Sequence, residues 1–439
     1  MRSWLALVAL AGCAPAPPDS DPLGPGNVLL VVLDDVGAYD VHAYGFEPDA
    51  PRTPTLDALA AQGVRFTRAW GNPLCSPSRA SIQTGLYPFR TGVGDNLPRQ
   101  GDAFALPVAM PNLPTWLRDH AGYTTAAIGK WHLSTDRDPQ GATPLSYGFD
   151  SYVGQPTNLL DVESEGEVVR TSYTRWHEWR DGYRWHKGYL THTEIDDAIA
   201  TVATLPSPWF LQVAVHAVHL PLQLPPDTPE PDGGWTGRLK YVTMLEDLDA
   251  QLGRLLDAVP EDTTVVVVGD NGAPNNLDIP DFDAADTKGS VMEGGIRVPM
   301  IVRSPWVTHP GVAVDALVHL VDLFPTLAQI AQAPVDDALS LDGRSLTPFL
   351  NDPQAPDTRP VVYSERFQPS GDPALATLRE QAIRDTRYKL TRSDGVDACF
   401  DLGDDVHEAA DLLTRPTLSA AAQDACAALA ARLDAGDVR

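Results

Sequence analysis

Three runs of apolar, largely β-branched residues constrain the fold more than any other feature of the chain. They are residues 27–33 (NVLLVVL), 209–215 (WFLQVAV) and 263–268 (TTVVVV). Runs without polar alternation are typical of strands buried on both faces of a parallel sheet. Helical patterns lie between them, and the longest places leucines at helical spacing from Tyr241 to Leu256. The alternation predicts an α/β protein with a large, mostly parallel sheet flanked by helices.

Shorter segments extend this pattern to the end of the chain. We expect further helices at residues 55–61, 78–84, 113–120 and 318–331, and further strands at 123–128 and 298–302. From about Pro360 the sequence pattern changes. It predicts short strands at 361–366, 381–384 and 388–391, followed by an alanine-rich helix at 420–433. We therefore predict a main domain over residues 27–355 and a smaller C-terminal α+β domain over residues 356–439.

The first residues have the pattern of an export signal. Arg2 precedes an apolar run that ends in Leu10-Ala11-Gly12-Cys13, which resembles a bacterial lipoprotein signal cleaved before Cys13. This predicts a signal peptide over residues 1–12 and a proline-rich tether over residues 13–26. A lipid on Cys13 would anchor an exported protein in the periplasm or on the cell surface. A plain secretory signal that contains a cysteine is the alternative. No later apolar stretch is long enough to span a bilayer.

The charge balance limits the partners of the chain. It has 59 acidic and 32 basic residues, a net charge of −27. This charge repels phosphate backbones and argues against nucleic acid as a partner. An anionic substrate needs a local cationic pocket that overcomes the surrounding field. The composition leaves the oligomeric state open.

The chain contains four cysteines. Cys13 belongs to the export signal. Cys399 and Cys426 lie near each other in sequence and can form a disulfide in an export compartment, or remain two buried thiols. Cys75 is then the odd cysteine, which makes it a candidate for a reactive group.

Oxygen-bearing side chains follow two of the apolar runs directly. Asp34 and Asp35 follow the first run, and Asp270 and Asn271 follow the third. The carboxyl ends of parallel strands meet at one edge of a sheet, where ligands bind. Three carboxylates and an amide oxygen suit Ca²⁺ or Mg²⁺. Taken singly, each pair also fits a turn or a helix cap.

Short motifs in the same regions resemble those of the sulfatase family. The run Cys75-Ser76-Pro77-Ser78-Arg79 matches the Cys-x-Pro-Ser-Arg motif. Further matches follow in family order: Gly129-Lys130-Trp131-His132-Leu133, His219-Leu220-Pro221-Leu222-Gln223, Lys288, and Glu293-Gly294-Gly295 with Arg297. The last segments look most like arylsulfatase B, or N-acetylgalactosamine-4-sulfatase-like, members.

The resemblance implies an alkaline phosphatase-like fold and a modified nucleophile. A maturation enzyme would oxidise Cys75 to formylglycine, whose hydrate attacks the sulfur of a sulfated sugar or aryl sulfate. One Ca²⁺ ion, with Mg²⁺ as the alternative, would be held by Asp34, Asp35, position 75, Asp270 and Asn271.

The resemblance also implies roles for charged side chains. Arg79, Lys130 and Lys288 would neutralise the sulfate oxygens. His219 would protonate the leaving alcohol, and His132 would act as the base that eliminates sulfate. His216 is a nearby competitor of His219. The structural alternative for each histidine is a hydrogen-bonded core residue.

One departure from the family pattern concerns maturation. The chain has Thr84-Gly85-Leu86 where the family commonly has Thr-Gly-Arg, a segment that helps recognition by the maturing enzyme. Leu86 therefore bears on how efficiently Cys75 is converted.

Two other functions fit parts of the pattern. A phosphonate or phosphate ester hydrolase of the same superfamily shares the Cys-x-Pro-Ser-Arg motif. A non-catalytic glycan-binding lipoprotein would keep Cys75 as a thiol.

A dense aromatic segment lies outside these motifs. Its members are Trp176, His177, Trp179, Tyr183, Trp185, His186 and Tyr189. They could stack on sugar rings beside the pocket, or form a loop that folds over the core with its own aromatics. The second interpretation is the favoured one, so the segment contributes no residue to the predicted catalytic site.

Overall fold

A computed structural model of the protein describes residues 26–97, 104–134, 144–159, 162–164, 167–279, 282–357 and 359–439. The predicted signal peptide, 1–12, and the predicted tether, 13–26 apart from Gly26, lie outside the described residues. Among the residues that the structure describes, no helix combines the length and apolarity needed to cross a membrane.

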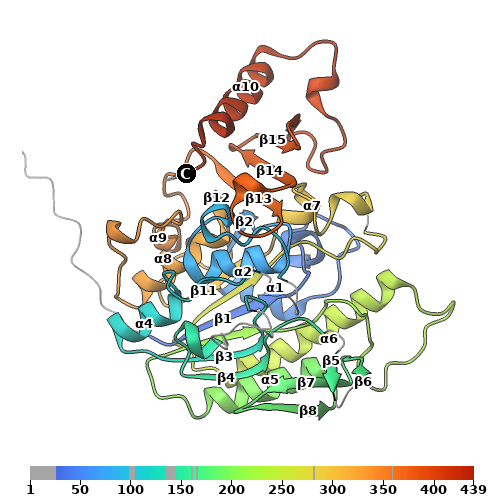
Figure 1. Ribbon diagram of the computed structural model, residues 1–439, viewed down its shortest axis with the longest axis vertical. Coiled ribbons are helices and arrows are strands. Elements are labelled where there is room, and N and C mark those ends of the chain that lie inside the picture. The colour runs from blue at the N-terminus through green and yellow to red at the C-terminus, as the bar shows by residue number, and fades with distance from the viewer. Residues whose placement is uncertain are drawn as a thin grey trace, which may run out of the picture.

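The main sheet has ten strands in the order β12-β2-β11-β10-β1-β9-β3-β4-β7-β8 (Figure 1). Its centre is parallel and consists of β10 (Thr264–Gly269), β1 (Val28–Leu33), β9 (Trp209–Ala214), β3 (Thr124–Lys130) and β4 (Ser151–Gln155). The three apolar runs of the sequence form β1, β9 and β10, and every residue of these strands is buried. The predicted α/β class with a mostly parallel sheet is therefore confirmed.

The outer strands make the sheet mixed. On one side β11 (Met300–Arg303) is antiparallel to β10 and to β2 (Val64–Trp70), and β12 (Val312–His319) is parallel to β2. On the other side β7 (Arg175–Trp179) is antiparallel to β4 and forms a hairpin with β8 (Tyr183–Lys187). A separate two-stranded sheet pairs β5 (Val162–Ser164) with β6 (Glu167–Val169).

Helices cover both faces of the main sheet because neighbouring side chains of a strand point to opposite faces. Val28, Leu30 and Val32 of β1 belong to the core that includes α2 (Cys75–Thr84), α4 (Leu113–Ala121) and α8 (Leu323–Ile330). Leu29, Val31 and Leu33 belong to the opposite core, which includes α1 (Pro54–Gln62), α5 (Leu190–Val202) and α6 (Gly237–Ala258). Three shorter helices are α3 (Pro88–Thr91), α7 (Glu293–Ile296) and α9 (Thr347–Asn351).

The prediction of one helix over residues 318–331 is wrong at its start. Val318 and His319 end strand β12, a 3-10 turn follows at Leu320–Asp322, and α8 begins at Leu323. A helix from Val318 would place Pro325 in its interior, where proline lacks the N–H that the helix requires. In α8 Pro325 lies in the first turn, where that N–H has no partner within the helix.

The C-terminal part forms a second, antiparallel sheet at the top of Figure 1. It consists of β13 (Val362–Gln368), β14 (Leu378–Arg384), β15 (Tyr388–Ser393) and β16 (Val396–Asp401), and α10 (Ala420–Ala435) packs on it. Buried charges join this sheet to the main body. Lys389 Nζ on β15 lies 3.3 Å from Glu293 Oε1 of α7 and 2.7 Å from Glu408 Oε1.

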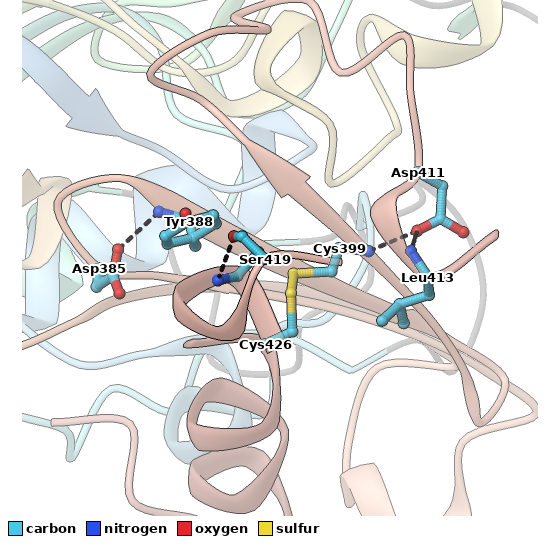
Figure 2. Close-up of a disulfide and its surroundings, with 8 residues drawn as sticks. Asp385, Tyr388, Cys399, Asp411, Leu413, Ser419 and Cys426 are labelled. Atoms are coloured by element: carbon cyan, nitrogen blue, oxygen red, sulfur yellow. Dashed lines mark hydrogen bonds between the residues drawn. A yellow bond between two sulfur atoms is a disulfide. The ribbon is translucent and has the colours of Figure 1, made fainter. Parts of the chain in front are cut away.

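A disulfide between Cys399 and Cys426 ties strand β16 to helix α10 (Figure 2). Of the two alternatives that the sequence left open, the structure contains the disulfide. Asp411 supports the strand side, because its carboxylate accepts hydrogen bonds from the backbone of Cys399 at 3.0 Å and of Leu413 at 2.9 Å. On the helix side, the Ser419 hydroxyl caps α10 by accepting from Ala422 N at 3.2 Å.

We expect reduction of this disulfide to lower the free energy of unfolding of the C-terminal sheet and helix by about 3–4 kcal/mol. The bond closes a loop with a sequence separation of 27, and opening that loop increases the conformational entropy of the unfolded chain. Hydrogen exchange of α10 with and without reductant measures the change. The double variant Cys399→Ala/Cys426→Ala should show the same loss and no response to reductant. Equal protection in all four samples would contradict the prediction.

Candidate active site

The carboxyl ends of the parallel strands bring the predicted site residues to one edge of the sheet. Asp34 and Asp35 follow β1, and Asp270 and Asn271 follow β10. Lys130 is the last residue of β3, and His132 lies two residues beyond it. His219 lies in the loop after β9, and Lys288 lies in the loop before α7. Cys75 is the first residue of α2, whereas the sequence placed the helix start at residue 78.

The backbone of this edge adopts conformations that ordinary residues rarely take. Asp35 and His132 have φ angles of 62° and 63°, which cost of order 1–3 kcal/mol each. At Gly272 an added Cβ would lie 1.8 Å from the carbonyl oxygen of Gly294. The loop that carries Asn271 can therefore pack directly on the backbone of α7 only because residue 272 is glycine.

Buried carboxylates and cations alternate around Cys75. Lys130 Nζ lies 2.5 Å from Asp34 Oδ2, and Lys288 Nζ lies 2.6 Å from Asp35 Oδ1. Burial alone would raise the pKa of the Asp34 carboxyl. The ammonium group of Lys130 and other nearby cations instead hold it well below its usual value. Asp34 is therefore an anion at neutral pH.

Arg79 forms the third cation pair. Its Nε and Nη2 atoms donate to Asp270 Oδ2 at 3.1 and 2.9 Å, and its Nη1 donates to the backbone oxygen of Lys130 at 2.8 Å. Burial and the Asp34 carboxylate raise the pKa of Asp270 to about 6, and Arg79 opposes that rise. Arg79 thus links the ends of β10 and β3, and its Nη2 also lies 3.7 Å from Asp34 Oδ2.

Cys75 is the one free cysteine among the described residues, and it is buried. Its Sγ lies 3.3 Å from Asp34 Oδ1 and 3.7 Å from Asp35 Oδ1, and Lys288 Nζ donates to it at 3.4 Å. Burial, and then the carboxylates of Asp270 and Asp34, raise the pKa of the thiol well above its ordinary value. An unmodified Cys75 is therefore protonated, and a protonated thiol is a weak nucleophile.

The first turn of α2 offers little to an anion. The N–H of Ser76 donates to Asn96 Oδ1 at 3.3 Å, Pro77 has no N–H, and that of Ser78 donates to the Leu74 oxygen at 3.2 Å. The helix dipole remains, but the N–H groups of Ser76 and Ser78 are already engaged. Positive charge at the site comes mainly from the lysine and arginine side chains.

The two predicted catalytic histidines differ in their surroundings. His219 Nδ1 donates to the Leu220 oxygen at 2.6 Å, which leaves Nε2 as the acceptor nitrogen of the ring. Burial, and then the charges of Lys288 and Lys130, lower the pKa of His219 to about 4. His132 Nε2 lies 3.4 Å from Asn158 Nδ2, and its Nδ1 is buried without a partner among the described residues.

His216 is held apart from this cluster by a carboxylate that no motif predicted. Its Nδ1 donates to Glu194 Oε1 at 2.6 Å, and its backbone N–H donates to Glu194 Oε2 at 3.1 Å. Tyr173, also absent from the predicted site, donates from Oη to the backbone oxygens of His216 at 2.5 Å and His219 at 2.8 Å. These residues fix the loop that carries His219.

The oxygen atoms at this edge fit a hard divalent cation. Ligand atoms of Asp34, Asp35, Cys75 and His219 all lie within 4.8 Å of one another. Asp35 Oδ2 and Asn271 Oδ1 are buried and have no hydrogen-bond partner among the described residues. Buried carboxylate and amide oxygens without partners are suited to Ca²⁺ or Mg²⁺. The oxygens of Asp270 are already engaged, Oδ1 by Asp35 N at 3.1 Å and Oδ2 by Arg79.

Comparison with known proteins assigns the chain to a family. The model of the family described as Sulfatase matches residues 26–333, and the model described as N-sulphoglucosamine sulphohydrolase, C-terminal, matches residues 285–434. Arylsulfatase J of Mus musculus is 30% identical over 72% of this chain and 54% of its own length. The chain therefore corresponds to about half of that relative.

Two further matches cover more of both partners. N-acetylgalactosamine-6-sulfatase of Homo sapiens is 29% identical over 77% of this chain and 68% of its own length. The crystal structure of Ps i-CgsB superposes with a TM-score of 0.76 at 26% identity, over 94% of this chain and 92% of that chain. The family match spans both the cysteine motif and the carboxylate pairs, so we conclude that the chain belongs to the sulfatase family.

Proposed function

We propose that this protein is a sulfuric ester hydrolase that acts on sulfated sugars, with a formylglycine formed from Cys75 and a bound Ca²⁺ ion. The observation that carries the proposal is the buried cluster of three cations and three carboxylates around position 75. A site of this kind costs several kcal/mol of desolvation per ion, which a stability role alone does not require.

The charge of the cluster favours a singly charged ester. The cluster pairs three carboxylates, Asp34, Asp35 and Asp270, with three cationic side chains, Arg79, Lys130 and Lys288. The residues are therefore balanced, and a divalent cation leaves a surplus of two positive charges. An oxygen nucleophile and a sulfate monoester, each carrying one negative charge, together match that surplus. A doubly charged phosphate monoester with the same nucleophile exceeds it.

The residues divide the chemistry between them. When position 75 carries the aldehyde, its hydrate supplies the nucleophile, and the metal ion supplies positive charge toward the sulfate oxygens. Lys288, which donates to Cys75 Sγ, and Lys130, which pairs with Asp34, hold cationic charge near position 75 and stabilise the charge that develops on sulfate. Arg79 keeps Asp270 in place.

His219 and His132 carry out the proton transfers of the proposed reaction. An anion bound beside His219 offsets the charges of the two lysines and raises the pKa of the ring, as a proton donor to the leaving alcohol requires. His132 Nε2, which accepts from Asn158 Nδ2 and is therefore the basic nitrogen of the neutral ring, can take the proton of the second hydroxyl during elimination of sulfate.

The aldehyde at position 75 requires chemistry from outside the chain. Converting the thiol to an aldehyde is a two-electron oxidation in which water supplies the oxygen and sulfur leaves as hydrogen sulfide. A maturation enzyme would supply the oxidant. The relatives named N-acetylgalactosamine-6-sulfatase favour a sulfated sugar as the alcohol.

We expect Cys75→Ala to lower sulfate release from an aryl sulfate by at least about 10³-fold, since it removes the nucleophile. Mass spectrometry of the peptide that spans residue 75 should detect the aldehyde in active wild-type protein. The control is the same chain made in a host without the maturation enzyme, which should retain the thiol and lack activity. Full activity with only thiol at position 75 would overturn the formylglycine mechanism.

We expect Ca²⁺ to raise the melting temperature of the protein and a chelator to lower it, because the ion binds only the folded site. Asn271→Ala should remove most of this response, since Asn271 Oδ1 is one of the buried oxygens without a partner. Asp196→Asn, at an exposed carboxylate paired with Arg254, is the control and should keep the full response. An equal rise in melting temperature with Ca²⁺ in both variants would show that the ion binds at another site.

We expect hydrolysis of an aryl sulfate to exceed that of the matched phenylphosphonate and phosphate esters by at least tenfold in kcat/KM. The charge balance separates the sulfate from the phosphate ester, and the phosphonate monoester tests the superfamily alternative. Faster cleavage of the phosphonate would contradict the proposed reaction and favour a phosphonate ester hydrolase. Sulfated-glycan binding without any sulfate release, unchanged by Cys75→Ala, would instead favour the non-catalytic glycan-binding alternative.

A further inference from the structure

The β7–β8 hairpin presents two distinct faces. In its register, Arg175 pairs with Lys187, His177 with Trp185, and Trp179 with Tyr183, and these six side chains share one face. The intervening pairs point to the other face, where Trp176 and Glu178 are buried. Arg175, Lys187 and Tyr183 are exposed, and the other three are partly exposed. We call these six residues the outer face of the hairpin.

The outer face is cationic at one end, in a chain whose net charge is −27. Arg175 and Lys187 lie directly opposite each other across the two strands, an arrangement of like charges that destabilises a sheet. Neither forms an ion pair with a carboxylate in the part of the chain that the structure describes. Arg180, in the turn of the hairpin, is in contrast neutralised, since it pairs with Glu178 at 3.1 Å.

Aromatic rings continue the outer face beyond the two cations. The Arg175 guanidinium lies 4.5 Å from the centre of the Trp185 ring. His177 stacks on Tyr183 with centroids 4.9 Å apart and lies 5.1 Å from Trp185, and Trp179 meets Tyr183 edge to face at 5.2 Å. The rings thus form one continuous row beside the cations.

Both ends of the hairpin are also hydrogen-bonded to the loop after β9, which carries His219. Tyr173, two residues before β7, binds the backbone of His216 and His219. Tyr189, two residues after β8, donates from Oη to the Gln223 oxygen at 2.9 Å. The hairpin lies at the edge of the main sheet in Figure 1. Both anchors are buried. Within the aromatic segment, Trp176 and Tyr189 are buried and Trp179 packs partly buried against the core, so the structural interpretation holds for these three residues.

We propose that the outer face of the hairpin is a binding site for a sulfated polysaccharide, separate from the catalytic cluster. The cations match sulfate groups, and the rings match the apolar faces of sugars. A strand of five residues is about 16 Å long, which is longer than one sugar ring and suits an extended chain. The expectation that the ligand is sulfated rests on the proposed function. The inference adds to that function a second site, which holds the polymer away from the catalytic residues.

The test measures binding of the full chain to three soluble probes by affinity electrophoresis: dextran sulfate, uncharged dextran and polyacrylate. Wild-type protein should bind dextran sulfate most tightly. Arg175→Ala/Lys187→Ala should raise the Kd for dextran sulfate at least tenfold. The charge-matched control Arg118→Ala/Arg254→Ala, at exposed arginines elsewhere, should change it less than twofold.

The aromatic contribution needs its own variant. Trp185→Ala should weaken binding of dextran sulfate severalfold and leave binding of polyacrylate unchanged, since only the sugar polymer stacks on rings. Turnover of a small aryl sulfate should stay at the wild-type rate in all hairpin variants, which also shows that they fold.

Three outcomes would overturn the inference: no binding of dextran sulfate by the wild type, equal losses in the control, or wild-type binding by Trp185→Ala. A protein that cleaves no sulfate ester but shows the predicted pattern of binding would refute the proposed function and leave the polysaccharide site standing.

Discussion

The burial of three carboxylates at one edge of a sheet is the constraint on which the rest of this structure depends. A single unpaired carboxylate in such a place costs several kcal/mol, so each one requires a cation and further hydrogen bonds. The cations come from separate elements: Arg79 from α2, Lys130 from β3, and Lys288 from the loop before α7. Helix, strand and loop therefore have to meet at this edge before the charges can be matched. The two left-handed residues, Asp35 and His132, are tolerated because this network holds them in place.

A second buried network of charged side chains, centred on Glu293, supports the active-site cluster. The Glu293 carboxylate at the start of α7 is held by Arg297, Lys389 and Arg384, and although burial opposes it, these cations lower its pKa to about 2. Lys389 and Arg384 belong to the C-terminal sheet. Since Gly272 packs on the backbone of α7, that sheet braces the loop that carries Asp270 and Asn271. The smaller sheet is thus part of the framework of the site, although it contributes none of the residues of the carboxylate cluster.

The sequence predicted the centre of the fold well because strands buried on both faces must be apolar throughout. β1, β9 and β10 need no tertiary information to be recognised. β2 and β12 were missed, since they lie toward the edge of the sheet, where charged residues such as Arg65, Arg68 and Asp315 can face solvent. The motifs indicated which side chains would share the site, but not how they pair. The contact of Arg79 with Asp270, and the support from Glu194 and Tyr173, connect residues with no fixed spacing and need the fold to be seen.

The complete burial of Cys75 has a consequence for the order of events in biosynthesis. Its sulfur lies beneath Lys288 and beside two carboxylates, within a helix whose ten residues are all buried. An enzyme that has to touch this side chain cannot reach it once the sheet and helix have closed around it. Under the proposed function, modification at position 75 and folding would then compete for the same chain. A molecule that folds first would keep a protonated thiol at this position.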